Sequence, residues 1–411
     1  MNYRIAESSY EYDLFVGQNG GSLFQTVTWA RVKKGWKSFA LVGEEEGRIL
    51  IGCLCMIRDI KFLGRLMYVP GGFVVDEFVR DSDIVCDFAD YVKAEMKRNH
   101  CFGIAADPTI VARLDGKDML ADISLYTSVG FKLNRGSSYV VQPLTEIVVP
   151  VKGKNRDELL KNCEKGVRHG YKTAIEGGCE VINIDGINAS FNDEYLDIFD
   201  KIMTETSERV NFIGRSRDYY KDILFNLKTD AELTLIKYDR DKQDEKYSGE
   251  KSELDELSSV ENPTPQQKKR IEILRKSTHL HESAEEELRD ISERVLWLGG
   301  GITSFFGNRS ECLYGGTVNL LRNTLRPTHI LNVERLFRSA EAGCEEHSMG
   351  RVTGDPFDKD NPLYGLATYK RSYGGQTAQY VGDLYYPAGT GLKMAVFTKL
   401  FPKIRHIRAT R

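Results

Sequence analysis

Alternating and continuous apolar runs in the first third of the chain predict an α/β unit. Residues 38–42 and 49–57 are strand-like runs on either side of a polar turn, which predicts a β-hairpin. The segment 82–99 then predicts a helix, because its apolar residues fall on one helical face: Val85, Phe88, Ala89, Val92 and Met96. The apolar run 101–106 predicts one further strand. Residues 1 to about 145 therefore indicate one α/β domain.

A similar order of elements returns after residue 146. The apolar run 147–151 predicts a strand, and the segment 156–177 predicts a helix with many basic residues. Further helices and strands are expected, on both sides of a charged interruption, at 193–207, 216–227, 232–238, 295–298, 311–316 and 331–342. Three glycines at 299–301 stand in a strand context, which favours a bulge or a close backbone approach over a phosphate-binding loop. We therefore expect a second unit of the same design.

The interruption is a stretch from about 239 to 293 that is dense in charged residues. Beyond a Pro-containing break at 262–265, apolar positions recur at seven-residue spacing in a seam that includes Leu274, Leu288, Ile291, Val295 and Leu298. Fewer positions fit before the break: Tyr247, Leu254 and Leu257. A long charged run without such a seam is typical of disorder, so the seam predicts an antiparallel two-helix coiled-coil arm over 239–297.

Composition changes this picture little. A chain of 411 residues predicts two or three domains, and a net charge of −3 means that any nucleic-acid contact has to come from a local patch. The eight cysteines form no CxxC pair and, with the seven histidines, no metal-ligand spacing, so we expect no metal and a reducing, cytoplasmic setting. No apolar run approaches the roughly 18 residues that span a bilayer, so a lipid substrate would be met from the inner face of the membrane.

The strongest functional signal is the segment 365–375, Gly-Leu-Ala-Thr-Tyr-Lys-Arg-Ser-Tyr-Gly-Gly, which presents a lysine beside aromatic residues. The sequence Tyr-Val-Gly-Asp follows it at 380–383. Earlier motifs are Phe24-Gln25, Trp-Ala-Arg-Val-Lys-Lys-Gly-Trp at 29–36, Tyr-Val-Pro-Gly-Gly at 68–72 and Asp107-Pro108. Together these motifs resemble the signature of the FemABX family, the bacterial peptidoglycan aminoacyltransferases, and they spread over nearly the whole chain.

The resemblance implies a fold and an activity. The fold is α/β, with two acetyltransferase-like (GNAT-type) domains in tandem, 1–145 and 146–238 with 298–411, and with the arm 239–297 inserted in the second. The activity is transfer of an amino acid from aminoacyl-tRNA to the stem-peptide amine of a peptidoglycan precursor, either lipid II or UDP-MurNAc-pentapeptide. The tRNA ester is already activated, so no cofactor and no nucleophilic side chain is needed, in agreement with the absence of a GxSxG motif.

The resemblance also assigns catalytic residues. Lys370, with Tyr369 before it, matches the aromatic-lysine pair that meets the acceptor end of the tRNA, where a cation can neutralise phosphate or the tetrahedral oxyanion. Asp107 matches the aspartate beside the acceptor amine, although an aspartate before proline often only shapes a turn.

Substrate-binding residues follow from the same comparison. Lys33 and Arg215 match two basic residues that bind the precursor's diphosphate, a group that an arginine fork fits well. Tyr314 matches a family aromatic residue. Each has a structural alternative: Lys33 could cap a helix that begins near residue 28, Arg215 precedes a helix start, and Tyr314 could pack in the core.

Two other functions stay open at this stage. An acyl-CoA-dependent N-acyltransferase of the same fold would require a pyrophosphate loop of the Q/RxxGxG/A kind, which the sequence lacks. A non-enzymatic interaction protein would act through the arm. Within the proposed aminoacyltransferase, the arm would either grip the tRNA or mediate self-association, and basic residues lie just past its tip: Lys268, Lys269, Arg270, Arg275 and Lys276.

Overall fold

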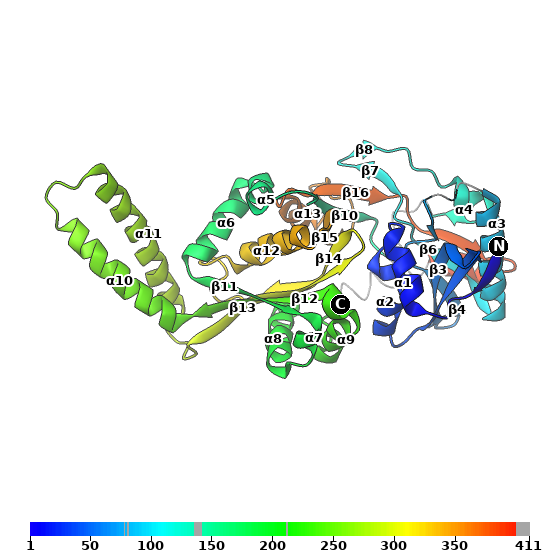
Figure 1. Ribbon diagram of the computed structural model, residues 1–411, viewed down its shortest axis with the longest axis horizontal. Coiled ribbons are helices and arrows are strands. Elements are labelled where there is room, and N and C mark those ends of the chain that lie inside the picture. The colour runs from blue at the N-terminus through cyan, green and yellow to red at the C-terminus, as the bar shows by residue number, and fades with distance from the viewer. Residues whose placement is uncertain (78, 80–81, 135–141, 211–212, 400–411) are drawn as a thin grey trace.

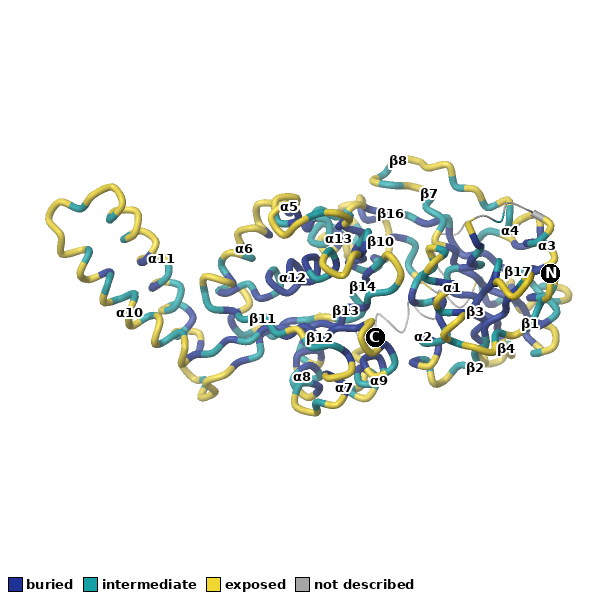
Figure 2. Tube along the Cα trace, in the orientation of Figure 1, coloured by how far each residue is buried: buried dark blue, intermediate teal, exposed yellow. Residues whose placement is uncertain are grey.

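The computed structural model describes residues 1–77, 79, 82–134, 142–210 and 213–399. These residues form two mixed β-sheets with helices packed on them, and a helical arm that projects from the end of the second sheet far from the first (Figure 1). Buried residues concentrate in the sheets and their helices, whereas most of the arm is exposed or half-buried (Figure 2). The predicted α/β class is confirmed.

The first sheet comes mainly from the first third of the chain. Its helix α3 (Ser82–Arg98) packs its apolar face on the sheet, and Phe88, Val92 and Met96 are fully buried there. The first domain also contains helices α1 (Ser9–Gln18), α2 (Val27–Val32) and α4 (Ser124–Ser128). The strand order is β1 (Asn2–Ile5), β2 (Lys37–Glu45), β3 (Arg48–Ile60), β4 (Gly64–Val69), β6 (Cys101–Ala106), β17 (Leu384–Pro387) and β9 (Lys132–Leu133), with β5 (Val74–Val75) beside β3.

The second sheet carries helices on both faces. These helices are α5 (Arg156–Asn162), α6 (Lys165–Glu176), α7 (Gly186–Ser190), α8 (Asp193–Val210), α9 (Arg217–Leu227), α12 (Pro327–Glu341) and α13 (Tyr364–Arg371). The strand order is β11 (Cys179–Asp185), β12 (Ala231–Asp239), β13 (Val295–Phe306), β14 (Arg309–Thr317), β15 (Glu346–Val352), β10 (Thr145–Pro150), β16 (Gln376–Tyr380), β7 (Val111–Leu114) and β8 (Lys117–Asp118).

Both sheets share one design. In the first, the antiparallel strands β2, β3 and β4 lead through α3 to β6, which pairs parallel with β4. In the second, the antiparallel strands β12, β13 and β14 lead through α12 to β15, which pairs parallel with β14. This repeated topology confirms the expected duplication of an acetyltransferase-like unit.

The sheets do not follow the predicted domain boundaries. Strand β17, expected in the second domain, pairs with β6 of the first sheet, and β7 with β8, expected in the first domain, extends the second sheet beyond β16. Each domain therefore completes its sheet with strands from the other part of the chain. Strand pairing between distant segments leaves no local pattern in a sequence. The boundaries 1–145 and 298–411 therefore assign β7, β8 and β17 to the wrong sheet.

Helix α2 also joins the two domains. Its Trp29 and Val32 are buried in the same apolar cluster as Phe199 of α8 and Tyr220 of α9. The N-terminal domain thus inserts an element into the core that covers one face of the second sheet, which fixes the side chains at the end of α2 relative to those near α9.

The basic segment 156–177 is not one helix. The chain is extended at Cys163, and helix α6 begins after Glu164, whose backbone N–H donates to the Ser372 carbonyl at 2.7 Å. The Arg168 guanidinium donates to the Cys163 carbonyl that the break leaves free. The glycine run 299–301 lies in β13, with a register shift on either side, as the strand context predicted.

The predicted two-helix arm is present as α10 (Arg240–Ser258) and α11 (Pro265–Glu287). Leu254, Leu274 and Ala284 are buried along it, and a bidentate ion pair joins Arg240 to Glu285 at its base. The seam was extended too far, since α11 ends at Glu287 and Val295 already begins strand β13. Leu288 and Leu298 are buried in the core of the second domain instead.

One group of side chains in the arm could geometrically hold a metal: Asp244, His281 and Glu285, whose ligand atoms lie within 4.8 Å of one another. Both carboxylates already pair with arginines, Asp244 with Arg294 and Glu285 with Arg240. The group is accounted for as an ion-pair network, and no metal is assigned to it.

Candidate functional site

A cavity of about 850 Å³ lies between the two sheets. Four of the predicted site residues line it: Lys33, Asp107, Arg215 and Tyr314. They come from the end of α2, the end of β6, the segment before α9 and strand β14, so both domains contribute. We call this cavity the interdomain cavity.

Lys33 closes helix α2 and also reaches the interdomain cavity. Its backbone N–H caps the helix, as the structural alternative expected, while its ammonium donates to the Tyr219 hydroxyl and lies 4.4 Å from the Trp29 ring centre. Burial, with a smaller contribution from Arg215, lowers the pKa of Lys33 to about 8. Among the described residues, no carboxylate pairs with Lys33 or Arg215, so both charges are available to an anion.

Aromatic rings connect these two cations. The Arg215 guanidinium lies 5.2 Å from the centre of the Tyr219 ring, and Tyr219 meets the Tyr314 ring edge-on at 6.0 Å. Tyr219 was not predicted as a site residue, because it lies in none of the motifs. The signal available in the sequence was its position four residues after Arg215.

Asp107 lies at the end of β6 and is buried. It accepts hydrogen bonds from the Tyr68 hydroxyl at 2.9 Å and from the Gly71 backbone N–H at 2.9 Å, and the Arg351 guanidinium is 4.0 Å away. Burial raises the pKa of Asp107, and Arg351 opposes the shift. These partners belong to strand β4, the loop after it and strand β15, so Asp107 holds neighbouring elements together in addition to lining the cavity.

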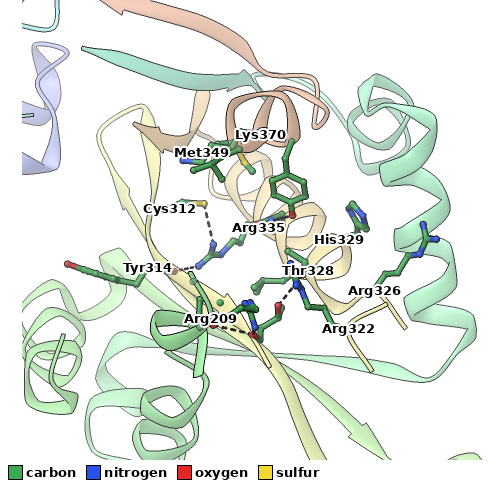
Figure 3. A pocket seen from close by; sticks show the side chains of 18 of the residues that line it. Arg209, Cys312, Tyr314, Arg322, Arg326, Thr328, His329, Arg335, Met349 and Lys370 are labelled. Atoms are coloured by element: carbon green, nitrogen blue, oxygen red, sulfur yellow. Dashed lines mark hydrogen bonds between the residues drawn. The ribbon is translucent and has the colours of Figure 1, made fainter. Parts of the chain in front are cut away.

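A second cavity, of about 750 Å³, lies between strand β14 and helix α12, and we call it the basic cavity (Figure 3). None of the described residues that line it is acidic, whereas its basic and imidazole side chains are Arg209, Arg322, Arg326, His329, Arg335 and Lys370. Such a cavity attracts an anionic ligand. The arginines were not predicted, because they come from separate segments with no common spacing.

The predicted pair Tyr369 and Lys370 belongs to the basic cavity, in the last turns of α13. The Lys370 ammonium donates to the Arg351 carbonyl at 3.4 Å, and burial lowers its pKa. The Tyr369 hydroxyl accepts from Asn332 at 2.9 Å and shares a 2.6 Å hydrogen bond with Tyr373, and burial raises its pKa to about 12. Lys370 is therefore fixed on a rigid element, as predicted.

The two cavities meet where strands β14 and β15 separate. Their parallel pairing covers only Arg309–Glu311 against Glu346–Ser348, and the next residues of β14, 312–314, line both cavities. Lys370 lies at this division, since its ammonium would be 3.4 Å from a Cβ atom built on Gly350 of β15. The structure thus places all the predicted residues along two cavities that share the lining residues 312–314.

Cys312 stands at the gap without the environment of a nucleophile. Its sulfur lies 3.1 Å from Nε2 of His347 and accepts from Arg335 (Figure 3), but His347 is completely buried and burial lowers its pKa to about 3. Nδ1 of His347 lies 2.8 Å from the Ser339 hydroxyl and 2.9 Å from the Ser310 hydroxyl. A neutral imidazole of such low basicity does not take the thiol proton.

Comparison with known proteins identifies the family. The sequence model of the FemAB family matches residues 8–398. The chain belongs to the FemAB family. Similar relatives include the lipid II:glycine glycyltransferases of Staphylococcus epidermidis, 29% identical over 92% of this chain and 91% of theirs, and of Staphylococcus aureus, 28% identical with the same coverage.

Solved structures support the fold of this FemAB protein. A crystal structure of FemX superposes with a TM-score of 0.78 over 97% of this chain and 100% of FemX, at 24% identity. The structure of L-PGS from Bacillus licheniformis gives a TM-score of 0.51 over 96% of both chains at 11% identity. The tandem acetyltransferase-like fold is therefore confirmed. None of the described helices is long and apolar enough to cross a membrane.

Proposed function

We propose that this FemAB protein transfers an amino acid from an aminoacyl-tRNA to a stem-peptide amine of a peptidoglycan precursor. Its relatives are named lipid II:glycine glycyltransferases, so glycine and lipid II are the first donor and acceptor to test. The observation that supports this most is the meeting of two cavities of different charge at one gap, with Lys370 at the division. Two substrates can enter from opposite faces of the sheet and react there.

The interdomain cavity suits the acceptor. Lys33 and Arg215 come from different domains, lack carboxylate partners in the described part of the chain, and are linked through Tyr219. Two such cations can hold a diphosphate, the group that lipid II and UDP-MurNAc-pentapeptide have in common. The same cavity contains Asp107, which can attract the acceptor ammonium toward the gap.

The basic cavity suits the 3′ end of the tRNA. Its lining of arginines can neutralise backbone phosphates. Leu325 and His329 pack against the end and middle of helix α6. That helix carries the exposed cations Lys165, Arg168 and Lys172. Lys370 would then meet the ester carbonyl and stabilise the oxyanion that forms during transfer. Removal of one such electrostatic donor typically costs about 3–4 kcal/mol of transition-state stabilisation.

An acyl-CoA donor fits this cavity less well. The chain between β14 and α12, residues 318–326, contains no glycine, and its backbone N–H groups at Asn319 and Leu321 already donate to the carboxylates of Glu205 and Glu287. The first residue of α12, Pro327, also lacks an N–H donor.

A reconstituted transfer assay tests the proposal. Purified protein is incubated with radiolabelled glycyl-, seryl- and alanyl-tRNA, each with lipid II or UDP-MurNAc-pentapeptide as acceptor, and acetyl-CoA replaces the tRNA in a parallel series. We expect labelled acceptor with one of the tRNAs and none with acetyl-CoA. Transfer from acetyl-CoA alone would overturn the proposed donor, and exclusive use of the nucleotide acceptor would overturn lipid II.

A further inference from the structure

Three buried or half-buried carboxylates converge on one arginine in the interdomain cavity. The Arg309 guanidinium pairs with Glu146 of β10 at 2.6 Å, with Glu311 of its own strand at 2.7 Å, and with Glu346 of β15. Arg351 also acts on Glu146 but lies beside Asp107 as well, so the carboxylates outnumber the guanidiniums and leave an excess of negative charge when all are ionised. A cation is therefore favoured next to this cluster, which lies in the cavity assigned above to the acceptor.

Glu146 and Glu311 are bonded very differently, although both are buried. Glu146 accepts from the Ser348 and Tyr380 hydroxyls in addition to Arg309, so its negative charge is well satisfied. Glu311 accepts a hydrogen bond from the Arg309 guanidinium. It also lies within hydrogen-bonding range of the Ser348 hydroxyl, but that hydroxyl donates its proton to Glu146. Of the two carboxyls, Glu311 is the one that geometry leaves ready to carry a proton.

The electrostatic environment agrees with this difference. Burial raises the pKa of Glu146, but Arg309, Arg351 and the hydroxyl donors outweigh burial and lower it to about 2. For Glu311, burial raises the pKa, and Glu146 adds to the shift, to a value of about 7 despite Arg309. Because Glu146 and Glu311 are neighbours that titrate as a pair, the hydrogen bonds to Glu146 are what assign the retained proton to Glu311.

Glu311 is also placed where a base is needed. It is the last residue of β14 that pairs with β15, and the gap between the two cavities opens at the next residue, Cys312. Asp107, by contrast, is held by two donors, the Tyr68 hydroxyl, which lies 2.9 Å from both carboxylate oxygens, and the Gly71 N–H, and is suited to anchoring an ammonium.

We propose that Glu311 is the general base of the transfer, the group that removes a proton from the acceptor ammonium; this rests on the proposed function. The ionised carboxylate takes one proton from the ammonium. The neutral amine then attacks the ester carbonyl, the carbon–nitrogen bond forms and the carbon–oxygen bond to the ribose breaks. The second amine proton leaves with the ribose oxygen, which becomes the free hydroxyl of the tRNA.

The charged and titratable groups around Glu311 come from four strands. They are Arg309 on β14, Glu146 on β10, Tyr380 on β16, and Glu346, His347 and Arg351 on β15. Burial lowers the pKa of His347 to about 3, and the arginines stay charged, so neither supplies a titration near neutrality.

The test is the pH dependence of kcat/KM for the acceptor in wild type and Glu311→Gln. Since Glu311 must be ionised to accept a proton, we expect the wild-type value to rise through a pKa of about 7. Glu311→Gln should lose this inflection and fall about 10²-fold or more at pH 8, with an unchanged unfolding temperature. Glu311→Asp should recover part of the rate together with the inflection. An unchanged pH profile in folded Glu311→Gln overturns the proposal.

Glu346→Gln is the matched variant, because it removes another carboxylate from the same guanidinium while leaving Glu311 in place. It should retain the rise through pH 7, and loss of that rise in both variants would assign it to the intact ion-pair cluster and not to ionisation of Glu311. A second measurement needs no transfer: ¹³C NMR of protein labelled at the glutamate carboxyls should show one signal that titrates near pH 7 and is absent from Glu311→Gln. Its absence from wild type overturns the inference, whereas titration without transfer to any acceptor would count against the proposed function alone.

Discussion

Lys33 and Arg215 reach the same cavity from different domains, and their shared neighbour Tyr219 makes them a pair. If they hold one diphosphate, each alanine substitution should raise the acceptor KM about tenfold or more, and the double substitution should be clearly less than additive. Lys34→Ala is the matched control, since Lys34 is exposed and pairs with Asp222. Independent, fully additive losses would contradict a shared ligand.

The pKa of Lys33 gives this pair a pH signature. Because burial lowers it to about 8, Lys33 loses its charge as the pH rises through that value, and acceptor binding should weaken there. Lys33→Arg should bind acceptor with little change up to a pH of about 10, since a guanidinium does not titrate in this range. The comparison of acceptor KM against pH for the two proteins measures the effect.

Lys370 belongs to the reaction centre itself. Lys370→Met keeps most of the buried aliphatic chain, so we expect a folded protein whose kcat/KM is lowered roughly 10²-fold or more. Lys359→Met, at an exposed position before α13, should leave the rate unchanged. Near-normal transfer by Lys370→Met would show that the oxyanion is stabilised elsewhere.

The family resemblance assigned Lys33, Asp107, Arg215, Tyr314, Tyr369 and Lys370, and the structure places all six along two cavities that share residues 312–314. It did not reveal Glu146 and Arg335, which line the cavities, or Tyr219, which contacts Lys33. One signal was available: Arg309 and Glu311 alternate with apolar or small residues in a strand, so their side chains share a face. Charges on a strand that is otherwise buried indicate a site.

At the scale of elements, apolar periodicity predicted most of the helices and strands because their core-facing residues recur at the regular spacing of each type. This periodicity predicted the wrong helix end where the first residue of a strand continues, by coincidence, the apolar spacing of the preceding helix. Leu288 and Val295 continue the seven-residue pattern of α11, yet the chain turns between them and Val295 enters β13. Competition from the strand partner β12 decides the boundary, and that partner lies more than fifty residues earlier along the chain.

The glycine run in β13 shows the opposite case, a local feature that was interpreted correctly. A Cβ atom at Gly301 would lie 1.6 Å from Nη2 of Arg335, the guanidinium that donates to the Tyr314 carbonyl. Gly301→Ala should therefore displace Arg335 and lower stability by about 1–3 kcal/mol in urea unfolding. Gly249→Ala in helix α10, where a Cβ has open space, should not destabilise the protein. Equal stability of both variants would contradict the close approach.

At the scale of the whole molecule, the two domains cannot be separated without loss of the site. Strand β17 completes the first sheet, β7 and β8 extend the second, and Trp29 of α2 is buried against α8 and α9. The duplication itself was predictable, because the order of elements repeats along the chain. The exchange of strands was not, since pairing between segments hundreds of residues apart depends on the folded whole.

None of the described residues that line the two cavities belongs to the arm helices α10 and α11. The arm joins Asp239 to Val295, which are paired neighbours in β12 and β13, so a short Gly-Ser turn can replace residues 240–294 and leave a hairpin. Arg270 and Lys276 are paired with glutamates, whereas Lys268, Lys269 and Arg275 are exposed and form no ion pair with the described residues. Three available cations make the arm a plausible grip for tRNA phosphates.

Deletion of the arm should therefore weaken tRNA binding while acceptor binding stays the same. If these three cations contact phosphates, the slope of log K against log salt should become smaller by about 2 to 3, and alanine substitution of Lys268, Lys269 and Arg275 should reproduce that change in the full-length protein. A matched variant, Glu256→Ala with Glu261→Ala, removes exposed acidic charge near the same tip and should not reduce the slope. Equal affinities and slopes for intact and arm-deleted protein would exclude the grip, and a change in sedimentation between the same two samples would then assign the arm to self-association.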